Sequence, residues 1–154
     1  MNRVCGRSTG FVYFSGRLCR EVRRAAAGYP FRVDFRLELV QVPVSDVDRA
    51  IGFYADQVGF TVDMDTEVGG GIRFVQLTPP GSPASIAIGT GLTTMAPGSV
   101  EGLQLVVTDV EAARAELAGR GVHVSDIQDF EWGRFVFFSD PDGNRWAVQQ
   151  PPAR

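Results

Sequence analysis

One order of turns and helix starts occurs twice in this chain of 154 residues. Ser45-Asp46-Val47-Asp48 is matched by Thr108-Asp109-Val110-Glu111, sixty-three positions later. Self-similarity of this kind indicates a repeated structural unit. The chain is therefore predicted to contain two copies of one unit, at about residues 37–90 and 101–150. Two further pairs of segments support the duplication: Gly59-Phe60-Thr61-Val62 with Gly121-Val122-His123-Val124, and Pro80-Gly81 with Asp142-Gly143.

The first copy has the periodicity of a β-α-β-β-β unit. Apolar residues alternate with other residues in the expected strands, and the expected helix places apolar residues such as Ala50 and Tyr54 three and four positions apart. Ser45 or Asp46 is predicted to cap this helix. The expected elements are a strand at 37–44, a helix that ends at Gly59, and strands at 60–64, 72–77 and 84–88.

The second copy repeats this order. Thr108-Asp109 is predicted to cap the second helix, with Ala112, Ala113 and Leu117 facing inward, and Gly121 to end it. The expected elements are a strand at 103–107, a helix at 110–117, a strand at 123–127 and a closing hairpin at 134–149.

The closing hairpin has clear turn chemistry. Pro141 fixes φ at the first central turn position, and Gly143 tolerates a positive φ. Trp146 and Ala147 begin an alternation of residue types along the last strand. That strand is therefore predicted to have two faces of different character.

Residues 1–34 show neither the repeat nor the alternation. They are predicted to be a flexible basic leader, or residues that precede the true start, and the domain is placed at residues 35–151. Both cysteines, Cys5 and Cys19, lie in this leader. The body therefore has no disulfide framework and no cysteine nucleophile.

Charge divides unevenly along the chain. Residues 1–36 carry a net charge of +6 and residues 37–154 a net charge of −9. An acidic body argues against nucleic-acid binding and favours neutral or cationic ligands. No apolar run approaches the roughly 20 residues that a membrane-spanning helix requires. The chain is therefore expected to be cytoplasmic, with no membrane partner.

The repeat and the hairpin together resemble the vicinal-oxygen-chelate superfamily, which includes glyoxalase I, bleomycin-resistance proteins and extradiol dioxygenases. This resemblance implies an α+β fold in which two βαβββ units form a curled, eight-stranded mixed sheet around a cavity, with the helices outside. It also implies a homodimer, often with cavities built from units of both subunits. The resemblance rests on Pro43-Val44-Ser45-Asp46-Val47, Phe53-Tyr54, Val58-Gly59-Phe60 and the hairpin turn Asp140-Pro141-Asp142-Gly143-Asn144.

The same resemblance assigns the family's metal ligands to four positions of this chain. None of them is His, Glu or Gln, whereas a divalent metal needs several N or O ligands within about 2–2.5 Å. We therefore expect no metal and no other cofactor. The four positions are Leu39, Ser85 or Ala87, Leu103 (Gly102 if the register slips by one residue) and Ala147.

A bound metal is the competing interpretation. Gln41 and Gln149 share the parity of the assigned positions, and Glu38, Glu101 or Gln104 would face the cavity in a register shifted by one residue. Amides without a carboxylate or an imidazole bind divalent metals poorly. The sequence therefore favours a cavity without metal.

Strand parity predicts a concave face that is mostly apolar, partly aromatic and tipped with a few polar groups, as small-molecule pockets are. Trp132 precedes a strand entrance, where metal-free drug-binding members of the family similarly keep aromatics that stack on flat ligands. The alternative for all these residues is that they only fill space. The predicted face consists of Leu39, Gln41, Val75, Leu103, Leu105, Phe135, Phe137, Arg145, Ala147 and Gln149.

Two functions follow from the resemblance. The first is a metal-independent binding protein that holds a small aromatic or polar organic molecule. The second is an enzyme of the same superfamily, such as a glyoxalase-like lyase or isomerase or a thiol transferase, which uses a divalent metal or metal-free acid–base catalysis. Glu38, Tyr54 and His123 are the candidates for such catalysis, and none has a visible partner in the sequence.

Overall fold

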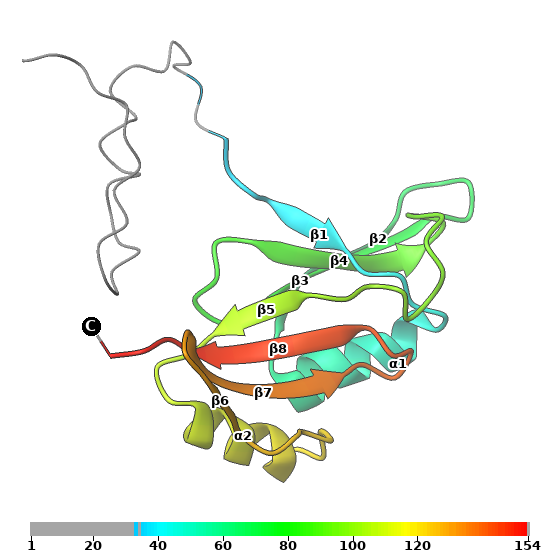
Figure 1. Cartoon of the computed structure of the whole chain (residues 1–154). Coiled ribbons are helices and arrows are strands. Elements are labelled where there is room, and N and C mark those ends of the chain that lie inside the picture. The colour runs from blue at the N-terminus through cyan, green and yellow to red at the C-terminus, as the bar shows by residue number, and fades with distance from the viewer. Residues whose placement is uncertain (1–32, 34, 154) are drawn as a thin grey trace, which may run out of the picture. The chain divides into compact units, whose positions relative to one another are not determined.

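The computed structural model describes residue 33 and residues 35–153 (Figure 1). Arg36–Arg154 is one compact unit. The leader predicted at residues 1–34 lies outside the described residues, apart from Val33, and stays a prediction.

The first repeat folds as the predicted βαβββ unit, with a π-helical segment added after its helix. Its four strands form one sheet in the order β1-β4-β3-β2. β1 runs parallel to β4, and the other neighbours are antiparallel. The elements are β1 (Leu39–Gln41), α1 (Val47–Ile51), η3 (Gly52–Val58), β2 (Thr61–Glu67), β3 (Arg73–Thr78) and β4 (Ser85–Thr90).

The second repeat builds a second four-stranded sheet in the matching order β5-β8-β7-β6. β5 runs parallel to β8, as β1 does to β4. The eight strands thus form two mixed sheets that are not closed into one barrel (Figure 1). The elements are β5 (Leu103–Val106), α2 (Val110–Gly119), β6 (Gln128–Phe130), β7 (Gly133–Ser139) and β8 (Arg145–Gln150).

Both helices begin at the aspartates that the repeat predicts. The Asp46 carboxylate accepts a hydrogen bond from the Arg49 backbone N–H at 3.0 Å. The Asp109 carboxylate accepts from the N–H groups of Glu111 and Ala112, at 2.9 and 3.0 Å. Each aspartate satisfies N–H groups that have no partner inside the helix and places negative charge at the positive end of the helix dipole.

The first helix widens into the π-helical segment η3 before it ends. Phe53 and Tyr54, which are adjacent in sequence, are both buried there. Gly59 ends the segment with φ at 92°, a left-handed conformation that residues with a Cβ rarely adopt.

One aromatic cluster forms the centre of the core and joins the two units. Tyr54 and Phe60 of the first unit each lie edge-on to Trp146 of the second, with ring centroids 5.9 and 5.7 Å apart. Phe138 stacks on Trp146 at 5.9 Å, and all four rings are at most 5% exposed. Burying apolar surface stabilises a fold by roughly 25 cal/mol per Å². Because these rings bury one another across the two repeats, they hold the repeats together as one domain.

The turn of the closing hairpin is fixed to the first unit by buried hydrogen bonds. The Tyr54 hydroxyl donates to the Asp140 carboxylate at 2.8 Å. The Asn144 side-chain amide donates both to Asp140, at 2.7 Å, and to the Pro43 carbonyl, at 2.9 Å. The family-like residues of the turn therefore have a structural function, which is to connect the repeats.

Some elements differ from those the sequence predicts. β1 has 3 residues rather than eight, because only Leu39–Gln41 pairs with β4. The predicted strand at 123–127 is wrong, although Ser125 N–H still bonds to the Phe137 carbonyl at 2.9 Å. Ala112 was predicted to face inward and is exposed.

Among the described residues, no helix is long and apolar enough to cross a membrane.

Candidate functional site

The outer face of the second sheet carries a continuous row of pocket-type side chains. Residues paired across neighbouring strands point to the same side of a sheet. Phe137 pairs with Ala147, and Ala147 pairs with Gln104 on its other side. Phe135 pairs with Gln149. These side chains therefore lie on the face opposite to Trp146 and Val148, which are buried in the core.

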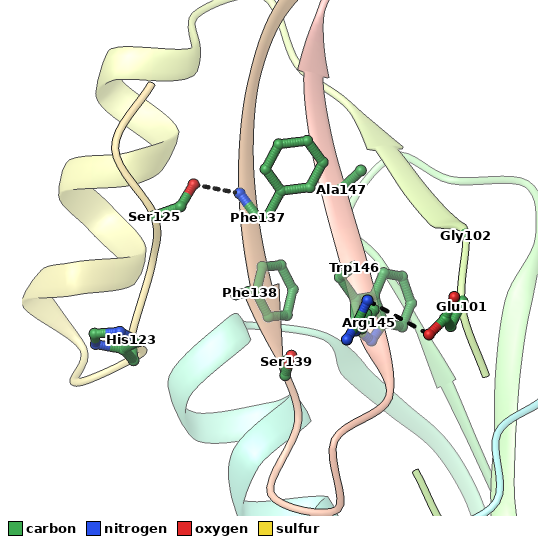
Figure 2. Close-up of a pocket in the computed structure, with 10 residues that line it drawn as sticks. All are labelled: Glu101, Gly102, His123, Ser125, Phe137, Phe138, Ser139, Arg145, Trp146 and Ala147. Atoms are coloured by element: carbon green, nitrogen blue, oxygen red, sulfur yellow. Dashed lines mark hydrogen bonds and ion pairs between the residues drawn. The ribbon is translucent and has the colours of Figure 1, made fainter. Parts of the chain in front are cut away.

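A pocket of about 580 Å³ opens over one end of this face (Figure 2). This volume lies within the range of sites for small organic ligands. Figure 2 shows Phe137 and Ala147 over the two central strands, with Arg145 and Glu101 at one rim. The lining residues are Glu101, Gly102, His123, Ser125, Phe137, Phe138, Ser139, Arg145, Trp146 and Ala147.

An aromatic ladder extends from the pocket along the same face. Phe137 stacks on Phe135, with centroids 6.1 Å apart and an angle of 8° between the rings. Phe130 meets Phe135 edge-on at 5.5 Å and stacks on Trp132 at 5.4 Å. Phe130, Trp132 and Phe137 remain 41%, 61% and 37% exposed. Exposed aromatic surface next to a pocket is typical of a binding face.

The two glutamines on this face bind one another and the backbone. The Gln149 amide nitrogen donates to the Trp132 carbonyl at 2.8 Å. Its oxygen accepts from the Gln104 amide at 2.5 Å. Gln149, a predicted ligand residue, therefore also holds the turn at Trp132.

The segment that flanks β7 supplies the other wall of the pocket. The Phe137 N–H donates to the Ser125 hydroxyl at 3.0 Å, and that hydroxyl donates to the Asp126 carbonyl at 2.8 Å. His123 lies two residues before Ser125 and also lines the pocket (Figure 2). The segment is not a strand, and Ser125 pairs with β7 through the bond from the Phe137 N–H and through its own N–H, which donates to the Phe137 carbonyl at 2.9 Å.

Arg145 and Glu101 form an ion pair of 3.4 Å at the rim. Their side chains are 70% and 69% exposed, so water screens the pair. Both belong to the second unit, and both line the pocket.

The first sheet presents a polar face instead. Leu39 and Gln41 pair with Ser85 and Ala87, and all four lie opposite to the core side. The Gln76 amide donates to the Ser85 hydroxyl at 3.1 Å, and Thr78 and Ser85 share a hydrogen bond of 2.7 Å. The two repeats therefore share a fold and differ in the chemistry of their outer faces.

Three residues predicted for the concave face lie on the other side of their strands. Leu103 pairs with Trp146 and Leu105 with Val148, so both pack against the core, and Val75 is fully buried beside Ile88. For Leu103 and Leu105 the prediction failed because the register of β5 was set one residue out, and for Val75 because the parity of β3 was assigned to the wrong face. Gln104 and Gly102 occupy the positions predicted for Leu105 and Leu103, and the sixty-three-residue repeat, which aligns Gln41 with Gln104 and Leu39 with Gly102, was a signal for this.

The side chains at the family's metal positions do not fit a divalent cation. Leu39, Gly102 and Ala147 offer no side-chain donor, and the Ser85 hydroxyl is bonded to Gln76 and Thr78. Within residues 35–153, no group of three or more His, Cys, Asp or Glu side chains converges in the way a metal site requires.

The candidates for acid–base catalysis are dispersed. Glu38 is exposed just before β1. Tyr54 is buried in the core, where burial, and then the charge of Asp140, raise the pKa of its hydroxyl far above the ordinary value of a tyrosine. Of the three candidates, only His123 lines the pocket.

The fold and the site define a class of protein: a duplicated βαβββ domain with an open, aromatic pocket on one sheet. Residues 36–148 match the Glyoxalase/Bleomycin resistance protein/Dioxygenase superfamily. The chain belongs to this superfamily, as the resemblance implied.

Similar proteins include an antibiotic binding protein. TnmS3, an antibiotic binding protein from Streptomyces sp. CB03234, is 39% identical, with a TM-score of 0.73 over 79% of this chain and 100% of that chain. A glyoxalase/bleomycin resistance protein from the same Streptomyces is 41% identical, with a TM-score of 0.67 over 75% of this chain and 100% of that chain. The uncharacterized protein YetH of Bacillus subtilis (strain 168) is 27% identical over 115 residues, which are 72% of this chain and 94% of that protein.

Proposed function

We propose that this chain is a small-molecule-binding protein that holds a flat aromatic ligand over β7 and β8 without chemical turnover. The observation that carries the proposal is the ladder of Phe137, Phe135, Phe130 and Trp132 beside a pocket of about 580 Å³. A planar ligand on Phe137 would extend this stack and cover an aromatic surface that is now partly in water. The likeness to an antibiotic binding protein supports the same function.

Binding is proposed to be independent of metal. The support is the chemistry of the side chains at the family's ligand positions, where methyl, isobutyl and hydrogen stand in place of carboxylate and imidazole. Gln104 pairs with Ala147 across the strands, and its side-chain amide donates a hydrogen bond to Gln149.

The protein is further proposed to act as a homodimer, with a second copy over the open faces of the sheets. Val106 is 65% exposed on the edge strand β5, and Trp132 is 61% exposed at the β6–β7 turn. Apolar side chains on an open sheet face and an unpaired edge are typical of a surface that another chain covers.

Direct binding measurements test the proposed function. We expect a thermal-shift screen of planar aromatic metabolites and antibiotics to find stabilising ligands, equally with and without Zn²⁺, Mn²⁺ and Ni²⁺. Phe137→Ala should weaken binding roughly tenfold, because a stacked aromatic pair and its buried area are lost. Phe35→Ala is the matched control, since Phe35 is 87% exposed before β1 and outside the pocket. Equal binding by the two variants, or conversion of a bound ligand to product, would contradict the proposal.

The enzyme alternative rests on one observation, that His123 is among the residues that line the pocket. A general base must reach the proton that it removes, and it works best when a partner orients it. His123→Ala distinguishes the two functions: it should leave binding nearly unchanged in a binding protein and abolish turnover in an enzyme.

A further inference from the structure

Two charged side chains sit at one end of the pocket, and the exposed aromatic ladder continues from the other. Arg145 and Glu101 occupy the rim, while Phe137 and the rest of the ladder continue away from it. This order of groups constrains the ligand more closely than the aromatic surface does alone.

The sheet register fixes the spacing between the two ends. Phe137 pairs directly with Ala147, and Arg145 is two residues before Ala147 on the same face of β8. Phe137 and Arg145 are therefore diagonal neighbours, and such neighbours lie roughly 7–8 Å apart. A fused bicyclic ring that stacks on Phe137 would place a substituent on its far edge against the Arg145 guanidinium.

The guanidinium is available to that substituent. Its only partner among the described residues is Glu101, through one contact of 3.4 Å between two side chains that are mostly exposed. An exposed ion pair of this kind is weak, whereas a carboxylate can bind a guanidinium through two parallel hydrogen bonds. A ligand anion can therefore replace Glu101 at little cost.

We propose, building on the aromatic-binding function above, that the pocket selects aromatic ligands that carry an acidic group. Arg145 is the specificity-determining residue, and Glu101 is an internal counter-ion that the ligand displaces. The net negative charge of the body would favour a cation, but screening at physiological salt limits such long-range effects to about 8 Å. The charge preference of the pocket is therefore set by the two charged side chains that line it, Arg145 and Glu101.

Three ligands of one shape test the proposal: naphthoate, naphthamide and naphthylmethylammonium, titrated calorimetrically into the full chain. We expect naphthoate to bind roughly two- to fivefold more tightly than naphthamide, as a bidentate pair with an exposed guanidinium implies, and the cation to bind least. Added NaCl should weaken naphthoate binding and leave naphthamide binding unchanged.

Two substitutions at the rim assign the effect to named residues. Arg145→Gln should remove the preference for naphthoate and leave the affinity for naphthamide intact. Glu101→Gln should raise the affinity for naphthoate about two- to fivefold, since it removes a competing partner of exposed-pair strength. Arg134→Gln is the control for net charge, because Arg134 lies on the other face of β7 and pairs with Glu111 and Asp129.

The possible results distinguish the acidic-ligand proposal from the aromatic-binding function on which it rests. If naphthamide binds as tightly as naphthoate, or Arg145→Gln keeps the preference, the acidic-ligand proposal is wrong and the aromatic pocket stands. If none of the three ligands binds, the aromatic pocket itself is contradicted, and this proposal with it.

Discussion

The Tyr54 hydroxyl donates a hydrogen bond to the Asp140 carboxylate at 2.8 Å, across 86 residues of sequence and between the two repeats. The indole N–H of Trp146 donates to the same hydroxyl at 3.2 Å. All three side chains are at most 5% exposed. The bond therefore couples the helical segment of the first unit to the hairpin that carries half of the pocket.

Removing this hydroxyl should destabilise the domain without changing its fold. Tyr54→Phe leaves the Trp146 N–H without an acceptor and Asp140 with one donor fewer, which should lower the free energy of unfolding by about 1–3 kcal/mol. Urea denaturation measures the change. Thr61→Val removes an exposed hydroxyl on β2 and should stay within about 0.5 kcal/mol of the parent chain. Equal effects of the two substitutions would show that the buried network contributes little.

Two glycines of similar backbone conformation should differ in their tolerance of alanine. Gly98 (φ 77°) and Gly121 (φ 85°) are both left-handed. A Cβ at Gly98 would lie 2.1 Å from the Asp142 carbonyl oxygen, whereas none of the described atoms lies within 4 Å of one at Gly121. Gly121→Ala should cost about 1–2 kcal/mol from backbone strain alone. Gly98→Ala should lower the free energy of unfolding further, which appears as a larger fall in the denaturation midpoint. Equal losses in the two variants would contradict the close approach of Gly98 to the hairpin turn at Asp142.

The acid stability of the domain should depend on Asp65. Two hydrogen bonds from the Arg73 guanidinium, at 2.9 and 2.7 Å, hold the pKa of this carboxyl below its usual value. Because the folded-state pKa is depressed, the stabilisation is present above the ordinary Asp value of about 4 and is lost as the pH falls through the folded-state pKa. Asp65→Asn should therefore lower Tm at pH 7, with a difference that shrinks below about pH 4. Asp126→Asn, at a carboxylate that is 97% exposed, is the control and should change Tm little at either pH.

Purified protein should contain no stoichiometric transition metal, and chelator should leave Tm unchanged. A metal bound to the folded state would add roughly 4 kcal/mol at a thousandfold excess over Kd, so its removal would be plain in a thermal melt. Elemental analysis by mass spectrometry, before and after EDTA, makes the measurement. A near-stoichiometric metal whose loss lowers both Tm and ligand affinity would favour the metal-dependent enzyme.

Light scattering at tens of micromolar should report a dimer. Val106→Asp places a charge on the exposed edge strand β5 and should shift the protein toward monomer with little change in the fold. Val68→Asp is a matched control, since Val68 is 61% exposed beyond the end of β2. A parent chain that is monomeric throughout this range would contradict the proposed assembly.

Most of the fold could be predicted because its determinants are local. The helix caps Asp46 and Asp109 and the hairpin turn at Gly143 act through neighbouring residues, and each is where the sequence places it. The wrong strand at 123–127 has no such local signal against it. Its apolar residues do alternate, but β7 makes only a few hydrogen bonds to it, and this is visible only in the structure.

The candidate site was less predictable, because it depends on register. Phe135, Phe137, Ala147 and Gln149 share a face as predicted, since the hairpin turn ties their strand to its neighbour. No such turn ties β5 to its neighbour β8. A register error of one residue therefore placed Leu103 on the open face, where Gly102 and Gln104 lie. The ion pair of Arg145 with Glu101 joins residues 44 positions apart and appears only once both strands are placed.

The alternation along β8 separates what keeps the domain folded from what sets its ligand. Trp146 and Val148 are 3% and 2% exposed in the core, while Arg145, Ala147 and Gln149 point to the open face. A substitution at one residue of β8 should therefore affect stability, and a substitution at the next should affect binding. A lineage can change its ligand through every second residue and keep its stability in the others, so homologues that differ widely in what they bind can remain superimposable in backbone.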